Sequence, residues 1–402
     1  MSKIKPNIRN AIILGTLCSI SYLAVYIARN ILGAVSPQMI EKGIFATEQV
    51  GTLSSVYFIC YAIGQLINGS IGDKIKAKYM ISFGLIFAGI GNQAFSFFAH
   101  IPFSSYIAYG LTGFFLSMIY GPMTKLISEN TEPIYATRCS LGYTFASFFG
   151  SPLAGILATF FKWQGVFLTG TIALLIMGAI CFISFTSLEK KSVIKYNQYN
   201  IEKGKGKGIK TLIERQIIKF TFVSVLTGVV RTSVVFWLPT YFSQYLNFSA
   251  EKSAAVFTVA TLLISMSAFI AVFIYERLNR DIDLTILIVF ISSALSFLLV
   301  YFIKSPTVNI ILMILAIISA NCAASMLWSV YCPRLKDTGM VSSATGFLDF
   351  MSYMAAAISS SIFANAVSTI GWKGLILVWF ALMTAGIIIA LPYRKIKEHF
   401  FP

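Results

Sequence analysis

Long runs of apolar residues, separated by short polar breaks, follow one another along almost the whole chain. A helix needs about 20 residues to cross the ~30 Å hydrocarbon core of a bilayer. Runs of this length recur regularly, so the pattern predicts a chain of membrane-spanning helices. We expect twelve spans, at residues 11–36, 48–70, 78–98, 103–127, 139–161, 163–186, 216–244, 251–275, 283–303, 307–333, 341–366 and 370–392.

One long polar segment divides the predicted spans into two groups of six. We therefore expect an N-terminal half (1–186), a basic cytoplasmic linker (187–215) and a C-terminal half (216–402). The halves share a feature, because Arg29 and Arg231 each lie in the first helix of a half, eight residues before a proline. Two parallel six-helix repeats, with the substrate site between them, are the construction of major facilitator transporters. The expected fold is accordingly an all-α integral membrane protein with two pseudo-symmetric halves.

Composition supports a membrane protein and excludes several classes of soluble protein. The chain is 57% hydrophobic and 11% charged, whereas soluble proteins average about 25% charged residues. Such a surface does not suit a soluble enzyme, a nucleic-acid-binding domain or a secreted disulfide scaffold. The six cysteines lie in or beside apolar runs without CxxC spacing, which indicates small packing residues.

The large positive charge is explained by topology. The net charge is +16, and most Lys and Arg residues fall in segments that lie on one side of the predicted membrane. The positive-inside rule assigns that side to the cytoplasm, with both termini cytoplasmic. We expect a protein of a bacterial cytoplasmic membrane whose basic linker lies on anionic lipid, and no nucleic-acid partner.

The charges inside the predicted spans do not balance. Arg29 and Arg231 lie within spans, and Asp349 is the one acidic residue clearly within a span. A buried arginine costs at least ~2.5–3.5 kcal/mol on insertion scales, so two of them need a reason. Guanidinium groups bind phosphate or carboxylate through two parallel hydrogen bonds, which suggests an anionic substrate. The alternative is that Asp349 pairs with one arginine and backbone carbonyls hold the other.

Polar side chains near these charges share helix faces. Tyr22, Tyr26 and Arg29 lie on one face of the first helix, and Tyr61 and Gln65 lie on one face of the second. These faces suit a polar cavity, although hydrogen bonding between packed helices would produce the same pattern. No metal-ligand cluster or nucleophile–base pair is visible, so we expect neither an enzyme nor a bound cofactor.

Two motifs connect the chain to a known family: Tyr22-x-x-x-Tyr26-x-x-Arg29, and Arg231-x-x-x-x-x-Trp237-x-Pro239-Thr240-Tyr241. Over nearly its whole length the chain resembles the organophosphate:phosphate antiporters of the major facilitator superfamily. The resemblance implies exchange of a small phosphorylated organic anion for inorganic phosphate by rocker-switch alternating access. It implies that Arg29 and Arg231 hold the phosphate and that Tyr26 and Tyr61 donate hydrogen bonds to it, and its second motif makes Trp237 and Tyr241 further substrate-binding candidates. We expect a monomer, because the site lies within one chain.

Departures from the family pattern leave two other functions open. Glycerol-phosphate exchangers have lysines where this chain has Asn30 and Gln65, and a histidine that its fifth predicted helix lacks. One alternative is a proton- or sodium-coupled symporter of sugar acids or other carboxylates, although its relatives carry Asp where this chain has Ala28. The other is a sensor that binds a sugar phosphate without transporting it.

Overall fold

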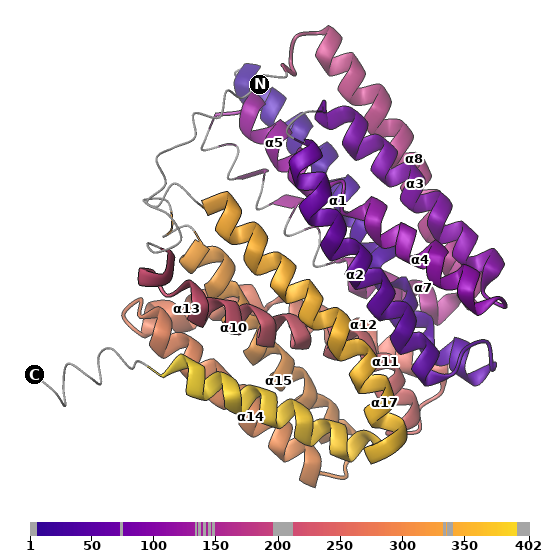
Figure 1. The fold of residues 1–402 in the computed structure, drawn as a ribbon, viewed down its shortest axis with the longest axis vertical. Coiled ribbons are helices and arrows are strands. Elements are labelled where there is room, and N and C mark those ends of the chain that lie inside the picture. Colours follow the sequence, from indigo (N-terminus) through magenta and orange to yellow (C-terminus); the bar gives the residue numbers. More distant parts are fainter. Residues whose placement is uncertain are drawn as a thin grey trace, which may run out of the picture. The chain divides into compact units, whose positions relative to one another are not determined.

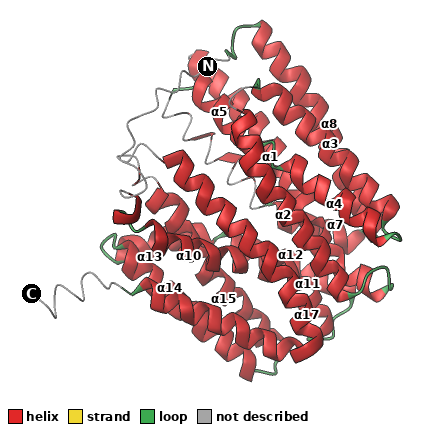
Figure 2. Cartoon of the chain, in the orientation of Figure 1, coloured by secondary structure: helices red, strands yellow, loops and turns green. Residues whose placement is uncertain are grey.

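The chain is seen here as a computed structural model, which describes residues 6–72, 75–132, 135, 138–139, 142–143, 146, 149–195, 212–332, 335 and 341–391. These residues form helices joined by turns, and the described part contains no strand (Figure 2). The centre of the predicted linker, residues 196–211, lies outside the described residues, as do the charged residues 73–74.

The chain divides by its internal contacts into two compact units, each described by itself below. Unit 1 comprises the described residues of Met1–Ile201 and Phe242–Leu262, and unit 2 those of Glu202–Tyr241 and Leu263–Pro402. The division into halves at a cytoplasmic linker stays a prediction.

Unit 1 is a bundle of long helices (Figure 1). Its helices are α1 (Pro6–Glu41), α2 (Thr47–Gly72), α3 (Ala77–Phe98), α4 (Pro102–Leu116), α5 (Tyr120–Asn130), α7 (Gly150–Phe160), α8 (Trp163–Lys190) and most of α12 (Ala250–Ser265). Close helix contacts here are made by small and polar residues, as is usual between helices in a membrane. Asn68 on α2 donates to Ser117 Oγ at 2.7 Å, and Asn92 on α3 donates to the Phe167 carbonyl of α8 at 2.9 Å.

Unit 2 contains two π-helical segments, η1 and η2, within its bundle. Its elements are α10 (Ile217–Gly228), η1 (Val229–Val234), most of α11 (Val235–Gln244), α13 (Ser267–Arg277), α14 (Ile282–Phe302), α15 (Pro306–Met326), η2 (Leu327–Tyr331) and α17 (Val341–Ala390). The two arms of α17 meet at Gly371, whose φ of 68° lies in the left-handed region that glycine adopts without strain. The first arm packs on α10 and the second on α14, where Phe297 lies 5.7 Å from Trp379.

The prediction of twelve spans is confirmed, with some breaks that it did not contain. Within the described residues, nine helices are long and apolar enough to cross a membrane, and α17 is one of them although it supplies two spans. The α4–α5 segment corresponds to the span predicted at 103–127, and α7 is the described helix of the span predicted at 139–161. The predicted single span at 103–127 is interrupted at residues 117–119, because Pro122 cannot donate its backbone hydrogen bond to the preceding turn.

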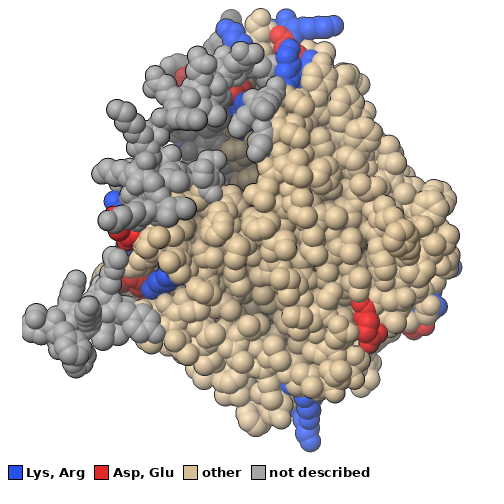
Figure 3. Space-filling view, in the orientation of Figure 1, with Lys and Arg blue, Asp and Glu red and all other residues tan. Residues whose placement is uncertain are grey.

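The outer surface of the helices suits lipid rather than water. Large apolar side chains are strongly exposed, including Phe160 at 78%, Phe97 at 74% and Phe103 at 73%. The face drawn in Figure 3 shows few charged side chains. Large apolar side chains exposed in such numbers suit the hydrocarbon of a bilayer better than water.

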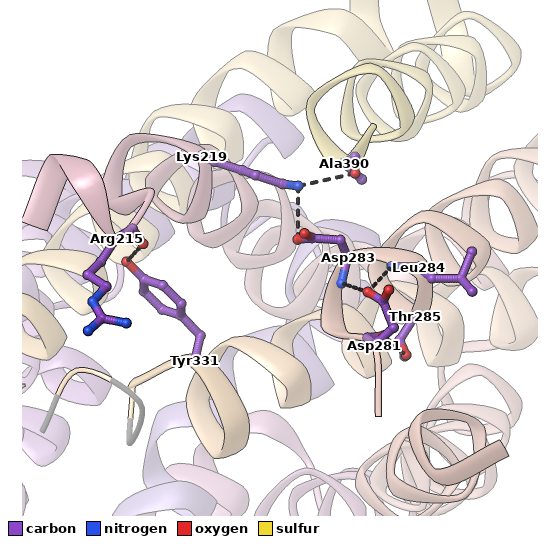
Figure 4. A network of polar contacts seen from close by, with 8 residues as sticks. All are labelled: Arg215, Lys219, Asp281, Asp283, Leu284, Thr285, Tyr331 and Ala390. Carbon is purple, nitrogen blue, oxygen red and sulfur yellow. Dashed lines mark hydrogen bonds and ion pairs between the residues drawn. The ribbon is translucent and has the colours of Figure 1, made fainter. Parts of the chain in front are cut away.

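Hydrogen bonds and an ion pair join three helices of unit 2 at one end (Figure 4). Lys219 of α10 donates to Asp283 of α14 at 3.0 Å and to the Ala390 carbonyl at the end of α17 at 3.2 Å. Asp281 caps α14 by accepting from the backbone N–H groups of Asp283 and Leu284. These contacts hold α10, α14 and the second arm of α17 together.

Candidate functional site

The Arg29 side chain lies within α1 and is surrounded by aromatic rings of unit 1. Its Cζ atom lies 5.3 Å from the centroid of Tyr26 and 5.5 Å from those of Phe58 and Tyr61. The residue is half-buried, whereas Phe58 and Tyr61 are buried on α2. A cation over an aromatic ring gains about 0.5–2 kcal/mol, so these contacts offset much of the cost of placing a guanidinium in a span.

A cluster of tyrosines extends from this cage along α1. The Tyr22 ring lies 4.9 Å from Tyr26, 5.6 Å from Tyr143 and 5.7 Å from Tyr120. The backbone around Tyr26 is fixed by close packing, since a Cβ added at Gly150 of α7 would lie 2.7 Å from its carbonyl carbon. Because Tyr22 contacts Tyr26 and Tyr26 contacts Arg29, these three residues lie together, as their shared helix face predicts.

The second wall of the cage is formed by one face of α2. Tyr61 stacks on Tyr57 at 6.2 Å, and Tyr57 packs in turn against Tyr109 of α4 at 4.9 Å. Gln65 is half-buried one turn beyond Tyr61, and it forms no hydrogen bond with the described residues of its unit. Asn30 of α1 donates to the backbone carbonyl of Tyr26 at 2.6 Å, so its amide nitrogen is used within its own helix.

Arg231 of unit 2 lies in the π-helical segment η1 and is half-buried. On either side of it, Gly228 packs directly on Ser352 of α17, and Ser233 donates to the Ala356 carbonyl at 2.7 Å. Gly228 and Ser233 therefore pack this segment against α17, and Arg231 lies between them in the sequence. Its guanidinium forms no hydrogen bond or ion pair with the described residues of its unit.

The remaining candidates of unit 2 lie on α11 and α17. Trp237 is fully buried, and its indole Nε1 has no hydrogen-bond partner among the described residues. Tyr241 is also fully buried, and its hydroxyl donates to Asn309 Oδ1 at 2.6 Å. Asp349 is half-buried beside Leu348, whose carbonyl accepts from Ser224 of α10 at 2.8 Å.

The structure thus assembles Tyr22, Tyr26, Arg29 and Tyr61 in unit 1, with Gln65 one turn away. It adds Phe58, which the sequence does not single out because a phenylalanine in an apolar span resembles any lipid-facing or core residue. In unit 2, the hydroxyl of Tyr241 donates a hydrogen bond to Asn309 within the bundle. The role of each of these residues in binding stays a prediction.

The sequence matches a family model described as Major Facilitator Superfamily over residues 18–360. It is 23% identical to the phosphoglycerate transporter protein of Salmonella typhimurium, over 92% of this chain and 85% of the relative. It is 19% identical to the membrane sensor protein UhpC of Escherichia coli, over 93% of this chain and 90% of the relative. The fold is similar to that of the nucleoside transporter NupG, with a TM-score of 0.72 and 16% identity over 94% of this chain and 98% of the other.

These relatives confirm the resemblance to organophosphate transporters that the helix motifs indicated. The family model covers most of the chain, and the fold, long apolar helices and helix order agree with it. The chain belongs to the Major Facilitator Superfamily, a family of membrane transporters.

Proposed function

We propose that the protein exchanges a small phosphorylated organic anion for inorganic phosphate across the membrane. The observation that carries the proposal is the half-buried guanidinium of Arg29, held inside a membrane span over the rings of Tyr26, Phe58 and Tyr61. The rings stabilise the cation without neutralising it, and a guanidinium binds phosphate oxygens strongly through its N–H groups. Similarity to a phosphoglycerate transporter supports a phosphate ester as that anion.

Arg231 supports a substrate with more than one negative charge. It is half-buried in η1, the segment that Gly228 and Ser233 pack against α17. Two arginines contributed by the first helix of each predicted half suit a phosphate dianion, because guanidinium binds phosphate oxygens in pairs. Tyr26 and Tyr61, whose rings lie beside the Arg29 guanidinium, would complete its contacts with the phosphate.

Exchange rather than one-way transport follows from the charge of the empty carrier. Without substrate, two positive charges in the spans are not balanced by a bound anion, which makes reorientation of the empty protein unfavourable. A bound phosphate or phosphate ester removes that penalty in either direction. The protein would then change its access between the two sides of the membrane mainly when loaded, by the alternating-access motion of its family.

The proposal is tested in proteoliposomes loaded with inorganic phosphate. We expect labelled phosphate to exchange against at least one of glycerol phosphate, phosphoglycerate and a hexose phosphate. Arg29→Lys and Arg231→Lys should each lower the exchange rate about tenfold to a hundredfold, because lysine cannot form the paired hydrogen bonds. The matched control is Arg277→Lys, an exposed arginine 5.3 Å from the Phe273 ring at a helix end, which should retain full exchange.

Other outcomes would assign a different function. Full exchange by either site variant would remove the arginines from the substrate site. Uptake that collapses with a protonophore and ignores phosphate on the far side would identify a symporter. Saturable binding of a phosphate ester without any exchange would identify a sensor, the second candidate, which similarity to a membrane sensor protein favours.

A further inference from the structure

Four exposed aromatic side chains form a continuous strip on the outside of α3 and α8, which lie side by side (Figure 1). Tyr79, Phe83 and Phe87 follow at four-residue intervals on α3, with ring centroids 6.0 and 6.1 Å apart. Phe182 of α8 lies 6.3 Å from Tyr79 and 6.0 Å from Phe83. All four are 38–43% exposed. We call these four side chains the aromatic strip.

One end of the aromatic strip carries an excess of positive charge. The Nζ atom of Lys78 lies 5.0 Å from the Tyr79 ring, and Glu189 at the end of α8 binds the ammonium groups of both Lys76 and Lys78. Two exposed lysines follow Glu189 in the chain, so these four lysines and one carboxylate together carry a net charge of +3. We call this group the basic end; its lysines are Lys76, Lys78, Lys190 and Lys191.

The dimensions of the aromatic strip match part of a lipid molecule. From Tyr79 to Phe87 the helix rises about 12 Å, at ~1.5 Å per residue. This covers most of the ~15 Å depth of one leaflet, half of the ~30 Å core. The rings also contact one another, so their flat faces are already ordered before a flexible acyl chain packs against them.

We propose that the aromatic strip and the basic end form a binding site for one anionic glycerophospholipid. The phosphate of the headgroup binds at the basic end, where each lysine near the surface attracts anionic lipid. One acyl chain lies along the rings. A second copy of the protein does not suit this face. Copies in one membrane share an orientation, so a twofold contact would bring the two basic ends together.

Native mass spectrometry of the full-length protein tests the site. The protein is purified from nanodiscs of one part phosphatidylglycerol to four parts phosphatidylethanolamine, and retained lipid is identified. We expect the wild-type protein to retain one phosphatidylglycerol in preference to phosphatidylethanolamine. Two variants act on different parts of the site, so a folding defect in one does not obscure the other. They are Phe83→Leu with Phe87→Leu, and Lys76→Gln with Lys190→Gln and Lys191→Gln.

Each of these variants should reduce retained phosphatidylglycerol about tenfold. The matched control for the rings is Phe97→Leu with Phe98→Leu, which changes two exposed rings at the other end of α3. The control for the charges is Lys252→Gln, an exposed lysine 3.9 Å from the Phe248 ring. Both controls should retain lipid at the wild-type level.

Three results would overturn the proposal. The first is equal retention by the Phe83–Phe87 variant and its Phe97–Phe98 control. The second is retention of phosphatidylethanolamine as readily as phosphatidylglycerol, which would indicate non-selective annular lipid only. The third is a wild-type dimer that the Phe83–Phe87 variant converts to a monomer, which would assign this face to a second copy.

Discussion

The guanidinium of Arg29 lies over the ring of Phe58, with 5.5 Å between Cζ and the ring centroid. The two residues belong to different helices, α1 and α2, and Phe58 is 4% exposed. The ring lacks a hydroxyl, unlike Tyr26 and Tyr61 beside it, so its contribution to the site is to hold the cation in place. This relationship makes Phe58 a positioning residue for the arginine that is proposed to bind phosphate.

Replacing the Phe58 ring should therefore weaken substrate binding without removing any group that touches the substrate. Under the proposed exchange function, Phe58→Leu should raise the KM for phosphate about threefold to tenfold, with a smaller effect on kcat, because the guanidinium loses one cation–π contact. Phe58→Tyr should restore the KM. Both are measured as phosphate exchange in proteoliposomes.

The matched control is Phe95→Leu, another buried ring of unit 1, which packs on Tyr109 at 5.0 Å and on Phe167 at 4.7 Å. It should lower stability and leave the KM unchanged. In an Arg29→Lys background, Phe58→Leu should add little further effect. A rise in KM that is the same with arginine or lysine at position 29 would contradict a positioning role for Phe58.

Gly150 determines how closely α7 approaches the Tyr26 backbone. An added Cβ would lie 2.4 Å from Tyr26 Cβ, too close for either helix to remain in place. Gly150→Ala should lower the free energy of unfolding by about 1–3 kcal/mol and reduce exchange, because the cage around Arg29 is displaced. Thermal unfolding and exchange assays measure the two effects.

Gly346→Ala is the control, since an added Cβ there meets nothing within 4 Å. Alanine in place of an uncrowded helical glycine should stabilise the protein by about 0.5–1 kcal/mol. If the two substitutions had the same effect, the close packing of α7 on α1 would not be the cause.

The hydroxyl of Tyr241 is a structural group of unit 2. Tyr241→Phe leaves the Asn309 Oδ1 atom buried without its donor, which should cost about 1–3 kcal/mol of unfolding free energy. The measurement is thermal unfolding in detergent. Tyr301→Phe is the control, because the half-buried Tyr301 forms no hydrogen bond with the described residues through its hydroxyl. Equal melting temperatures for the two variants would disprove the prediction.

Glu189 joins α8 to the beginning of α3 through two lysines that differ in exposure. Lys78 is 8% exposed and Lys76 is 50% exposed. Glu189→Gln leaves the buried Lys78 without its counter-charge and should cost about 1–2 kcal/mol, after allowance for the partial exposure of Glu189. Lys76→Gln should have almost no effect on thermal unfolding, because Lys78 keeps its partner.

The pH dependence of this pair follows from its charges. The hydrogen bond with Glu189 is the main cause that raises the pKa of Lys76 above its ordinary value. A raised lysine pKa stabilises the folded state below the pKa of the unfolded chain, and the effect is lost as pH rises through the folded pKa. Any contribution of Lys76 to the free energy of unfolding should therefore be constant near neutral pH and disappear in alkali. Loss of this contribution on acidification to pH 6 would contradict the assignment.

Much of the fold and part of the site could be predicted from the sequence. The spans follow from runs of about 20 apolar residues, because the bilayer imposes that length on any helix that crosses it. The face shared by Tyr22, Tyr26 and Arg29 follows from helical periodicity alone. An arginine inside such a span can be recognised in the sequence as an unbalanced charge, without knowledge of how the helices pack.

Tertiary structure decided which faces meet. Phe58 contacts Arg29 only because α2 packs beside α1, and nothing in an apolar span distinguishes that phenylalanine from Phe83, which faces lipid. The contacts of Gly228 and Ser233 with α17, on either side of Arg231, likewise follow from the packing of two segments that lie far apart in the chain. Sequence periodicity orders residues around one helix, whereas the orientation of each helix is set by its packing partners and by lipid, which lie far away in the chain or outside it.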